Sequence, residues 1–99
     1  MADYKLDGAI LKVEGHLDFQ DDHLLYDNCK KMMEADGSVL TVDLSKVPYI
    51  NSSCIGVLSA TWVDVLTQER KMELIVSGQV RRALTISGFH RVFNLKDPE

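Results

Sequence analysis

Residues 39–53 read VLTVDLSKVPYINSS, and this segment predicts a buried strand followed by the start of a helix. Residues 39–44 are nearly all apolar or β-branched, a pattern typical of a strand that is covered on both faces, as in a parallel or mixed sheet. Pro48 interrupts regular structure, and Asn51, Ser52 and Ser53 are residue types that cap helix N-termini. We therefore expect a central strand, a short loop and a helix that begins at residues 51–53.

The segments on either side predict further strands and helices. Asp7 and Gly8 separate two short apolar segments and suit the positive φ angles of a tight hairpin turn. Apolar residues at helical spacing indicate two amphipathic helices, one over residues 25–33 and one that ends near residue 68. Residues 72–76 resemble another buried strand, residues 80–87 a short helix closed by Gly88, and residues 92–93 a brief final strand. We expect an α/β protein with helices packed against a mixed sheet, in the order β-β-α-β-α-β-α-β.

Length and composition indicate one ordinary globular domain over residues 1–99. Hydrophobic residues make up 45% and charged residues 26% of the chain, as in an average folded domain. The formal net charge is −4 and basic residues form no cluster, which argues against nucleic-acid binding. No apolar run reaches the ~20 residues that cross a bilayer, and the N-terminus has no signal-peptide pattern. We expect a cytoplasmic protein without membrane insertion.

The motifs of the common enzyme classes are absent from the sequence. Ser52 and Ser53 are not set in a Gly-x-Ser-x-Gly elbow, and the histidines that could activate them belong to separate segments. Single glycines give no phosphate-binding loop, and the scattered His and Cys residues give no metal-ligand spacing. We therefore expect no catalysis, no cofactor and no metal.

The two cysteines, Cys29 and Cys54, belong to different expected helices and have no Cys-x-x-Cys spacing. Free, buried thiols are the simplest interpretation, because unpaired cysteine is among the most buried residue types. Cys54 leaves a second interpretation open, since a thiol in the first turn of a helix can have a lowered pKa and respond to oxidants.

The serines at the expected helix start also allow two interpretations. A phosphate on Ser52 or Ser53 would be stabilised by the free N–H groups and the positive dipole of the helix N-terminus, while adding about −1.5 to −2 charges to the surface. Such a modification would leave the fold intact and repel a partner. Alternatively, the serine is only a helix cap, a role worth about 1 kcal/mol.

A resemblance to a known family covers almost the whole chain. Residues 42–58 (VDLSKVPYINSSCIGVL) resemble the signature of the STAS domain of anti-sigma factor antagonists, in which Asp-Leu-Ser and an apolar pair precede Asp-Ser-Ser-Gly-Leu-Gly. Residues 15–18 (GHLD) resemble the family's Gly-x-Leu-Asp turn after the second strand. Residues 79–89 resemble its last helix and the turn that follows.

The resemblance implies a specific regulatory role. In that family, an anti-sigma factor that is also a serine kinase phosphorylates the serine directly after the Asp, and a serine phosphatase of the metal-dependent type removes the phosphate. The matching residue here is Ser52, with Ser53 as the second choice. The unphosphorylated bacterial protein would bind the anti-sigma factor and free its sigma factor, and the phosphate would break that contact. The implied partner-binding residues are Asp18, Asn51, Ser52, Ser53 and Cys54.

Two residues depart from the family pattern and keep alternatives open. Asn51 replaces the usual Asp beside the phosphoacceptor, and Cys54 replaces the usual Gly. These departures favour an alternative in which the chain is a constitutive STAS adaptor subunit of a transport or signalling assembly and no phosphate is involved. An enzyme or a nucleotide-binding protein is the third hypothesis, since some STAS domains are reported to bind nucleotides.

Overall fold

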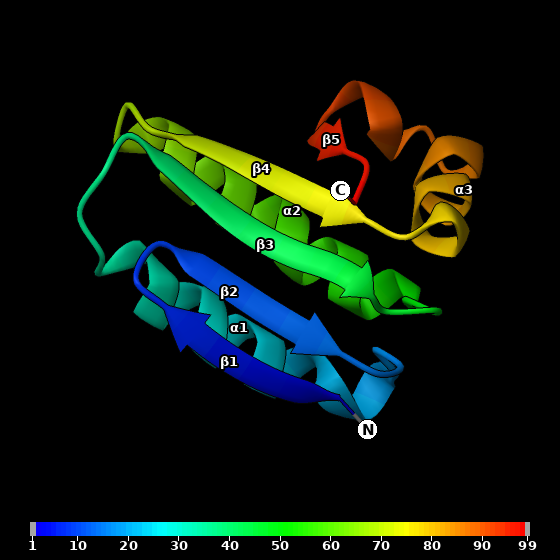
Figure 1. Ribbon diagram of the computed structural model, residues 1–99. Coiled ribbons are helices and arrows are strands. Elements are labelled where there is room, and N and C mark those ends of the chain that lie inside the picture. Colours follow the sequence, from blue (N-terminus) through cyan, green and yellow to red (C-terminus); the bar gives the residue numbers. More distant parts are fainter. Residues whose placement is uncertain (1, 99) are drawn as a thin grey trace.

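The computed structural model describes residues 2–98, which form a five-stranded mixed sheet and three α-helices (Figure 1). The strand order is β1-β2-β3-β4-β5; β1 and β2 are antiparallel, and all other neighbours are parallel. The predicted α/β class, mixed sheet and element order are confirmed. The elements are β1 (Asp3–Asp7), β2 (Ile10–Glu14), the short 3-10 helix η1 (Phe19–Asp21), α1 (Asp22–Met33), β3 (Val39–Lys46), α2 (Ser52–Thr67), β4 (Lys71–Val76), α3 (Gly78–Ile86), the 3-10 helix η2 (Phe89–Arg91) and β5 (Asn94–Lys96).

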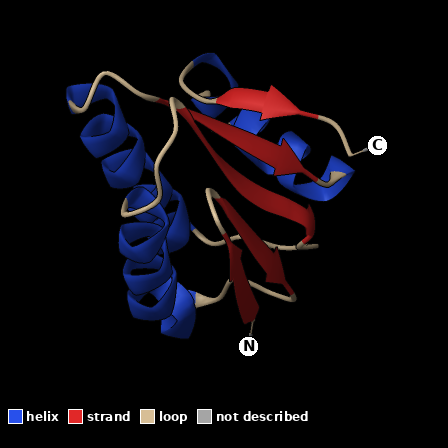
Figure 2. Cartoon of the chain, turned by 60° about the vertical axis from the view of Figure 1, so that its left-hand side comes forward, coloured by secondary structure: helices blue, strands red, loops and turns tan. Residues whose placement is uncertain are grey.

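Helices α1 and α2 lie side by side on one face of the sheet (Figure 2), and the core fills the space between these layers. In β3, Leu40, Val42 and Leu44 are fully buried, whereas Thr41 and Asp43 are only half-buried. The expectation that residues 39–44 are covered on both faces is therefore wrong. Because the parallel strands are added in one direction across the sheet, right-handed crossovers bring α1 and α2 to the same face.

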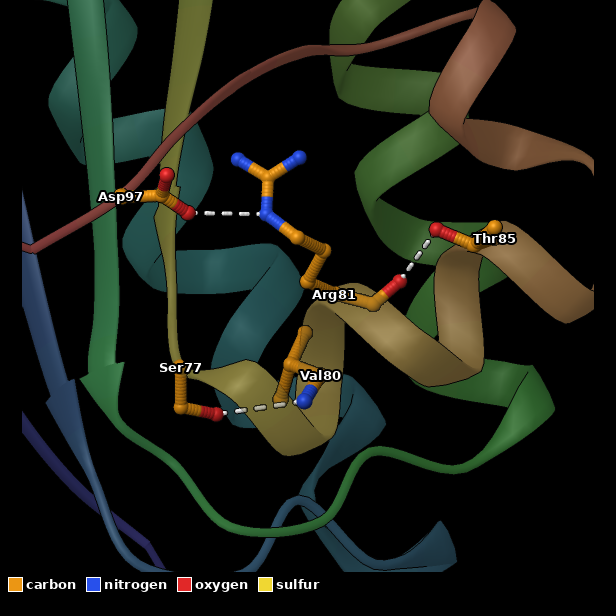
Figure 3. A network of polar contacts seen from close by, with 5 residues as sticks. All are labelled: Ser77, Val80, Arg81, Thr85 and Asp97. Carbon is orange, nitrogen blue, oxygen red and sulfur yellow. Dashed lines mark hydrogen bonds and ion pairs between the residues drawn. The ribbon is translucent and has the colours of Figure 1, made fainter.

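Helix α3 begins earlier than the expected residue 80, because Ser77 caps it. The Ser77 hydroxyl accepts a hydrogen bond from the Val80 N–H over 3.2 Å (Figure 3). The same hydroxyl donates to the carbonyl of Val47 over 2.6 Å, so the cap also holds the loop that leads to α2. Figure 3 further shows the ion pair of Arg81 with Asp97, which joins α3 to the residues after β5 over 2.9 Å. The short α3 is thus connected to both neighbouring segments.

The final strand, β5, is Asn94–Lys96. The sequence placed it at residues 92–93, so its expected position is wrong and the strand begins two residues later. The Phe93 N–H still bonds to the Phe89 carbonyl over 3.1 Å, which continues the turn of η2 through these residues. The two phenyl rings stack with centroids 5.9 Å apart, and Phe93 is buried. Phe93 therefore lies in a turn with its side chain in the hydrophobic core, and the chain becomes extended only after it.

Arg70, just before β4, holds the turn that follows α1. Its guanidinium donates to the carbonyl oxygens of Met33, Ala35 and Gly37 over 3.0, 2.6 and 2.7 Å. These carbonyls belong to the C-terminal end of α1 and the next turn, where a cation complements the helix dipole. One side chain therefore bonds to the last carbonyl of α1 and to two carbonyls of the turn that follows it.

Candidate functional site

The first turn of α2 is capped by Asn51, which resolves the question of which residue caps this helix. Asn51 has extended backbone angles, φ −90° and ψ 171°, and its Oδ1 accepts the Cys54 N–H over 3.0 Å. The Ser53 hydroxyl donates to the same Oδ1 over 3.0 Å. No hydrogen bond from the Ser52 side chain to another residue in the range 2–98 is found, and this serine is exposed. Ser52 is therefore an accessible hydroxyl with no capping role.

The backbone at this point also suits an anion. The first main-chain bond of α2 runs from the Ile55 N–H to the Asn51 carbonyl over 3.1 Å. The N–H groups of Ser52 and Ser53 precede this bond, as the first N–H groups of every α-helix do. Together with the positive end of the helix dipole, they would stabilise negative charge carried by either serine.

The segment after β2 lies directly beside the start of α2, at the end of the sheet where the carboxyl ends of β2 and β3 lie (Figure 1). The Leu17 N–H donates to the Tyr49 carbonyl over 2.9 Å, and the Asn51 N–H donates to the Leu17 carbonyl over 3.0 Å. These bonds form an isolated parallel bridge between Leu17 and Ile50. Asp18 is consequently brought next to Asn51.

Cys54 behaves differently from the other residues of the expected site, because its side chain is fully buried. Its Sγ donates a hydrogen bond to the Asp18 carbonyl over 3.5 Å. Burial, followed by the nearby carboxylates of Asp21 and Asp22, raises the pKa of the Cys54 thiol to about 11. The lowered pKa that would support redox sensing is therefore not found, because burial and the negative charge of nearby carboxylates raise the pKa. Cys29 and Cys54 are both free and buried, as predicted.

Asp21 is a residue of this site that the sequence interpretation missed. Asp21 is 2% exposed, and its carboxylate accepts the Asp18 N–H over 3.0 Å and the Ala2 N–H over 3.2 Å. The Tyr4 hydroxyl donates to it over 3.5 Å, and burial together with Asp21 raises the pKa of Tyr4. The Asp-x-x-Asp spacing at residues 18–21, typical of a capping turn, is the signal that could have identified it.

Two aromatic side chains beside the expected site are exposed. Phe19, in η1, is 70% exposed, and Tyr49, in the loop before α2, is 49% exposed. The Tyr49 ring lies near His16, with ring centroids 6.2 Å apart. Sequence patterns gave no signal for either aromatic, because the exposure of a single ring depends on which segments pack around it.

The surroundings of the α2 start are acidic. Asp18 bonds to the Cys54 thiol through its carbonyl, the Asp21 carboxylate bonds to the Asp18 N–H, and Asp22 follows directly in sequence. The two segments that build the site, residues 13–29 and 47–69, contain no Lys or Arg. An added phosphate would therefore meet the N–H groups of the helix but no cationic side chain of these segments.

Comparison with known proteins identifies the family. A family model described as the STAS domain matches residues 2–99. The chain belongs to the STAS domain family. Among solved structures, this STAS domain is similar to an anti-sigma factor antagonist from Mycobacterium paratuberculosis, with a TM-score of 0.78, 21% identity and coverage of 96% of this chain and 83% of that chain. It is also similar to the anti-sigma factor antagonist SpoIIAA in its unphosphorylated form, with a TM-score of 0.78, 12% identity and coverage of 100% and 89%. No curated protein matches the chain.

Elsewhere on this STAS domain, a cavity of about 360 Å³ lies on the uncovered face of the sheet. Lys5, Lys12 and Asp43 are successive cross-strand neighbours in its lining, so it carries charges of both signs. Within residues 2–98, no group of three or more His, Cys, Asp or Glu side chains could hold a metal ion. No helix in this part of the chain is long and apolar enough to cross a membrane.

Proposed function

We propose that this STAS domain is an anti-sigma factor antagonist whose partner binding is switched off by phosphorylation of Ser52. The partner is an anti-sigma factor that is also a serine protein kinase, and a serine phosphatase of the metal-dependent type restores the free hydroxyl. The observation that carries the proposal is the exposed Ser52 in the first turn of α2, beside Asp18 and free of a capping role. The names of the similar structures give the class of partner.

Charge provides the physical basis of the proposed switch. The phosphate adds about −1.5 to −2 charges at a helix N-terminus, where free N–H groups stabilise it. The domain therefore remains folded in both states. The same charge joins the carboxylates of Asp18, Asp21 and Asp22, and a partner surface that fitted the neutral hydroxyl loses both fit and electrostatic complementarity.

Hydrogen bonding favours Ser52 over Ser53 as the phosphoacceptor. The Ser53 hydroxyl is bonded to Asn51 Oδ1, the atom that caps α2, so a phosphate on Ser53 would place negative charge against the cap. Ser52 has no such bond and lies in the same exposed turn. Asn51 caps α2 with a neutral side chain. The kinase therefore meets no carboxylate at the position directly before Ser52, where the family pattern has Asp.

The proposal is tested by phosphorylation in vitro. The purified protein is incubated with ATP and, one at a time, with purified anti-sigma factor kinases from the same genome, and its intact mass and modified peptide are measured. We expect one added phosphate on Ser52, absent from Ser52→Ala and present in the matched variant Ser53→Ala. If the Ser52→Ala variant is phosphorylated on Ser53 instead, the proposal has named the wrong serine.

A second candidate function has one observation in its favour. Asn51, neutral where the family pattern has Asp, fits a constitutive adaptor subunit of a transport or signalling assembly that is never phosphorylated. The absence of phosphate with every kinase, together with a partner complex that survives Ser52→Asp, would favour this adaptor over the switch.

A further inference from the structure

We propose that Phe19 is the aromatic anchor of the partner-binding surface and inserts into an apolar cavity of the anti-sigma factor that basic side chains border. This inference rests on the proposed function and adds the chemistry of the contact. Phe19 is 70% exposed although phenylalanine is usually buried. Exposed aromatic side chains that a partner covers often supply much of the binding energy of an interface.

The turn that carries Phe19 is held rigid. Asp21, which is 2% exposed, accepts the Asp18 N–H over 3.0 Å, and the Asp21 N–H donates back to the Asp18 carbonyl over 2.9 Å. Burying a carboxylate is unfavourable unless it is well bonded, and the bonds of Asp21 hold the turn on both sides of Phe19. The backbone position of Phe19 is thus set before binding, which lowers the entropy lost when a partner encloses the ring.

The same turn is fastened to the phosphoacceptor helix. The Asp18 carbonyl, adjacent in sequence to Phe19, accepts the hydrogen bond of the buried Cys54 thiol over 3.5 Å. Cys54 lies in the first turn of α2 together with Ser52. Phe19 and Ser52 therefore belong to one rigid surface, and a partner that encloses the ring also meets the hydroxyl or its phosphate.

Charge selects the kind of partner. The surface around Phe19 includes the carboxylates of Asp18 and Asp22, and its two segments contain no Lys or Arg. Anionic lipid headgroups would be repelled by it. A symmetric pairing of two copies through this surface would bring like charges together, which is unfavourable. A folded protein with Lys or Arg around an apolar cavity is the partner that complements both features.

The test compares exposed apolar residues on different parts of the domain. Calorimetry measures the binding of the unphosphorylated chain to the same purified anti-sigma factor kinases that the phosphorylation test uses. The proteins compared are wild type, Phe19→Ala, Phe19→Trp and Ile86→Ala. Ile86 is 77% exposed at the end of α3 and serves as the matched control. We expect Phe19→Ala to weaken binding by about 30-fold or more. Phe19→Trp and Ile86→Ala should stay within about threefold of wild type, because one keeps an aromatic ring and the other lies on a different element.

The charge component has its own measurement. Raising NaCl from about 50 mM to about 500 mM should weaken binding of wild type, because exposed charge pairs are screened. Asp22→Asn should reduce this salt dependence. Binding that is indifferent to salt would overturn the basic border of the cavity.

The outcomes separate the two proposals. A kinase that binds wild type and Phe19→Ala equally tightly would overturn the anchor and leave the proposed function in place. If none of the kinases binds wild type, the proposed function is wrong, and the anchor falls with it. If Phe19→Ala binds weakly, its urea midpoint of unfolding must equal that of wild type, as expected for the loss of an exposed side chain. A lowered midpoint would mean that the variant binds weakly because it is less stable, and this outcome would contradict the anchor.

Discussion

The thiol of Cys54 donates a hydrogen bond to the carbonyl oxygen of Asp18 over 3.5 Å, across a separation of 36 residues. This contact joins the turn after β2 to the first turn of α2, the two segments that form the candidate site. Cys54 stands where the family pattern has glycine, which has no side chain to make such a bond. The residue that departs from the pattern is therefore a structural connection inside the site.

The Cys54 connection predicts a stability effect. We expect Cys54→Gly to lower the free energy of unfolding by about 2 to 3 kcal/mol, because it removes a buried side chain and adds a flexible residue to a helix. Urea denaturation measures this loss, and amide hydrogen exchange at residues 18–21 should accelerate. Gly56→Ala is the matched control in the same helix, since a Cβ at Gly56 would meet nothing within 4 Å. A Cys54→Gly variant as stable as wild type would contradict the connection.

The buried thiols predict a loss of stability in alkaline solution. Burial raises the pKa of both Cys29 and Cys54 from 9.0 to about 11. The folded state thus keeps its thiol protons at pH values where the unfolded chain releases them. The stabilisation is complete below about pH 9 and is lost as the pH rises toward about 11.

The size of the alkaline effect can be measured by urea denaturation. From about pH 8 to about pH 10, we expect a decrease of about 1 kcal/mol for each thiol. The double variant Cys29→Ala, Cys54→Ala should show a smaller decrease over the same range. Equal pH dependence in both proteins would show that the thiols titrate normally in the folded state.

The capping geometry predicts that Asn51 and Ser52 contribute differently to stability. Asn51→Ala should cost about 1 kcal/mol, because the Cys54 N–H loses its acceptor. Ser52→Ala should change stability by less than about 0.5 kcal/mol, since this hydroxyl has no bond to break. Thermal or urea denaturation of both variants distinguishes them. A large loss in Ser52→Ala would mean that this serine is the cap after all.

Much of the fold and part of the site could be predicted from local patterns. The apolar runs, the helical spacing and the Asn51-Ser52-Ser53 caps predicted the elements and their order, because strand and helix formation depend largely on neighbouring residues. The uncovered sheet face was missed, although residues 40–44 (LTVDL) alternate apolar and polar side chains, the pattern of a strand that is packed on one face only. The brief final strand was shifted, because Phe93 is apolar in both a strand and a packed turn.

The sequence by itself determined the alternation of strands and helices and the serines at the start of α2, because these follow from residue types a few positions apart. Only the tertiary structure decided which groups lose contact with water together. It buried Cys54 and Asp21, left Phe19 and Ser52 exposed, and brought residues 15–21 against α2. The pKa of Cys54 shows the reason: a local pattern favours a lowered value through the helix dipole, whereas burial beside carboxylates from a distant segment raises it.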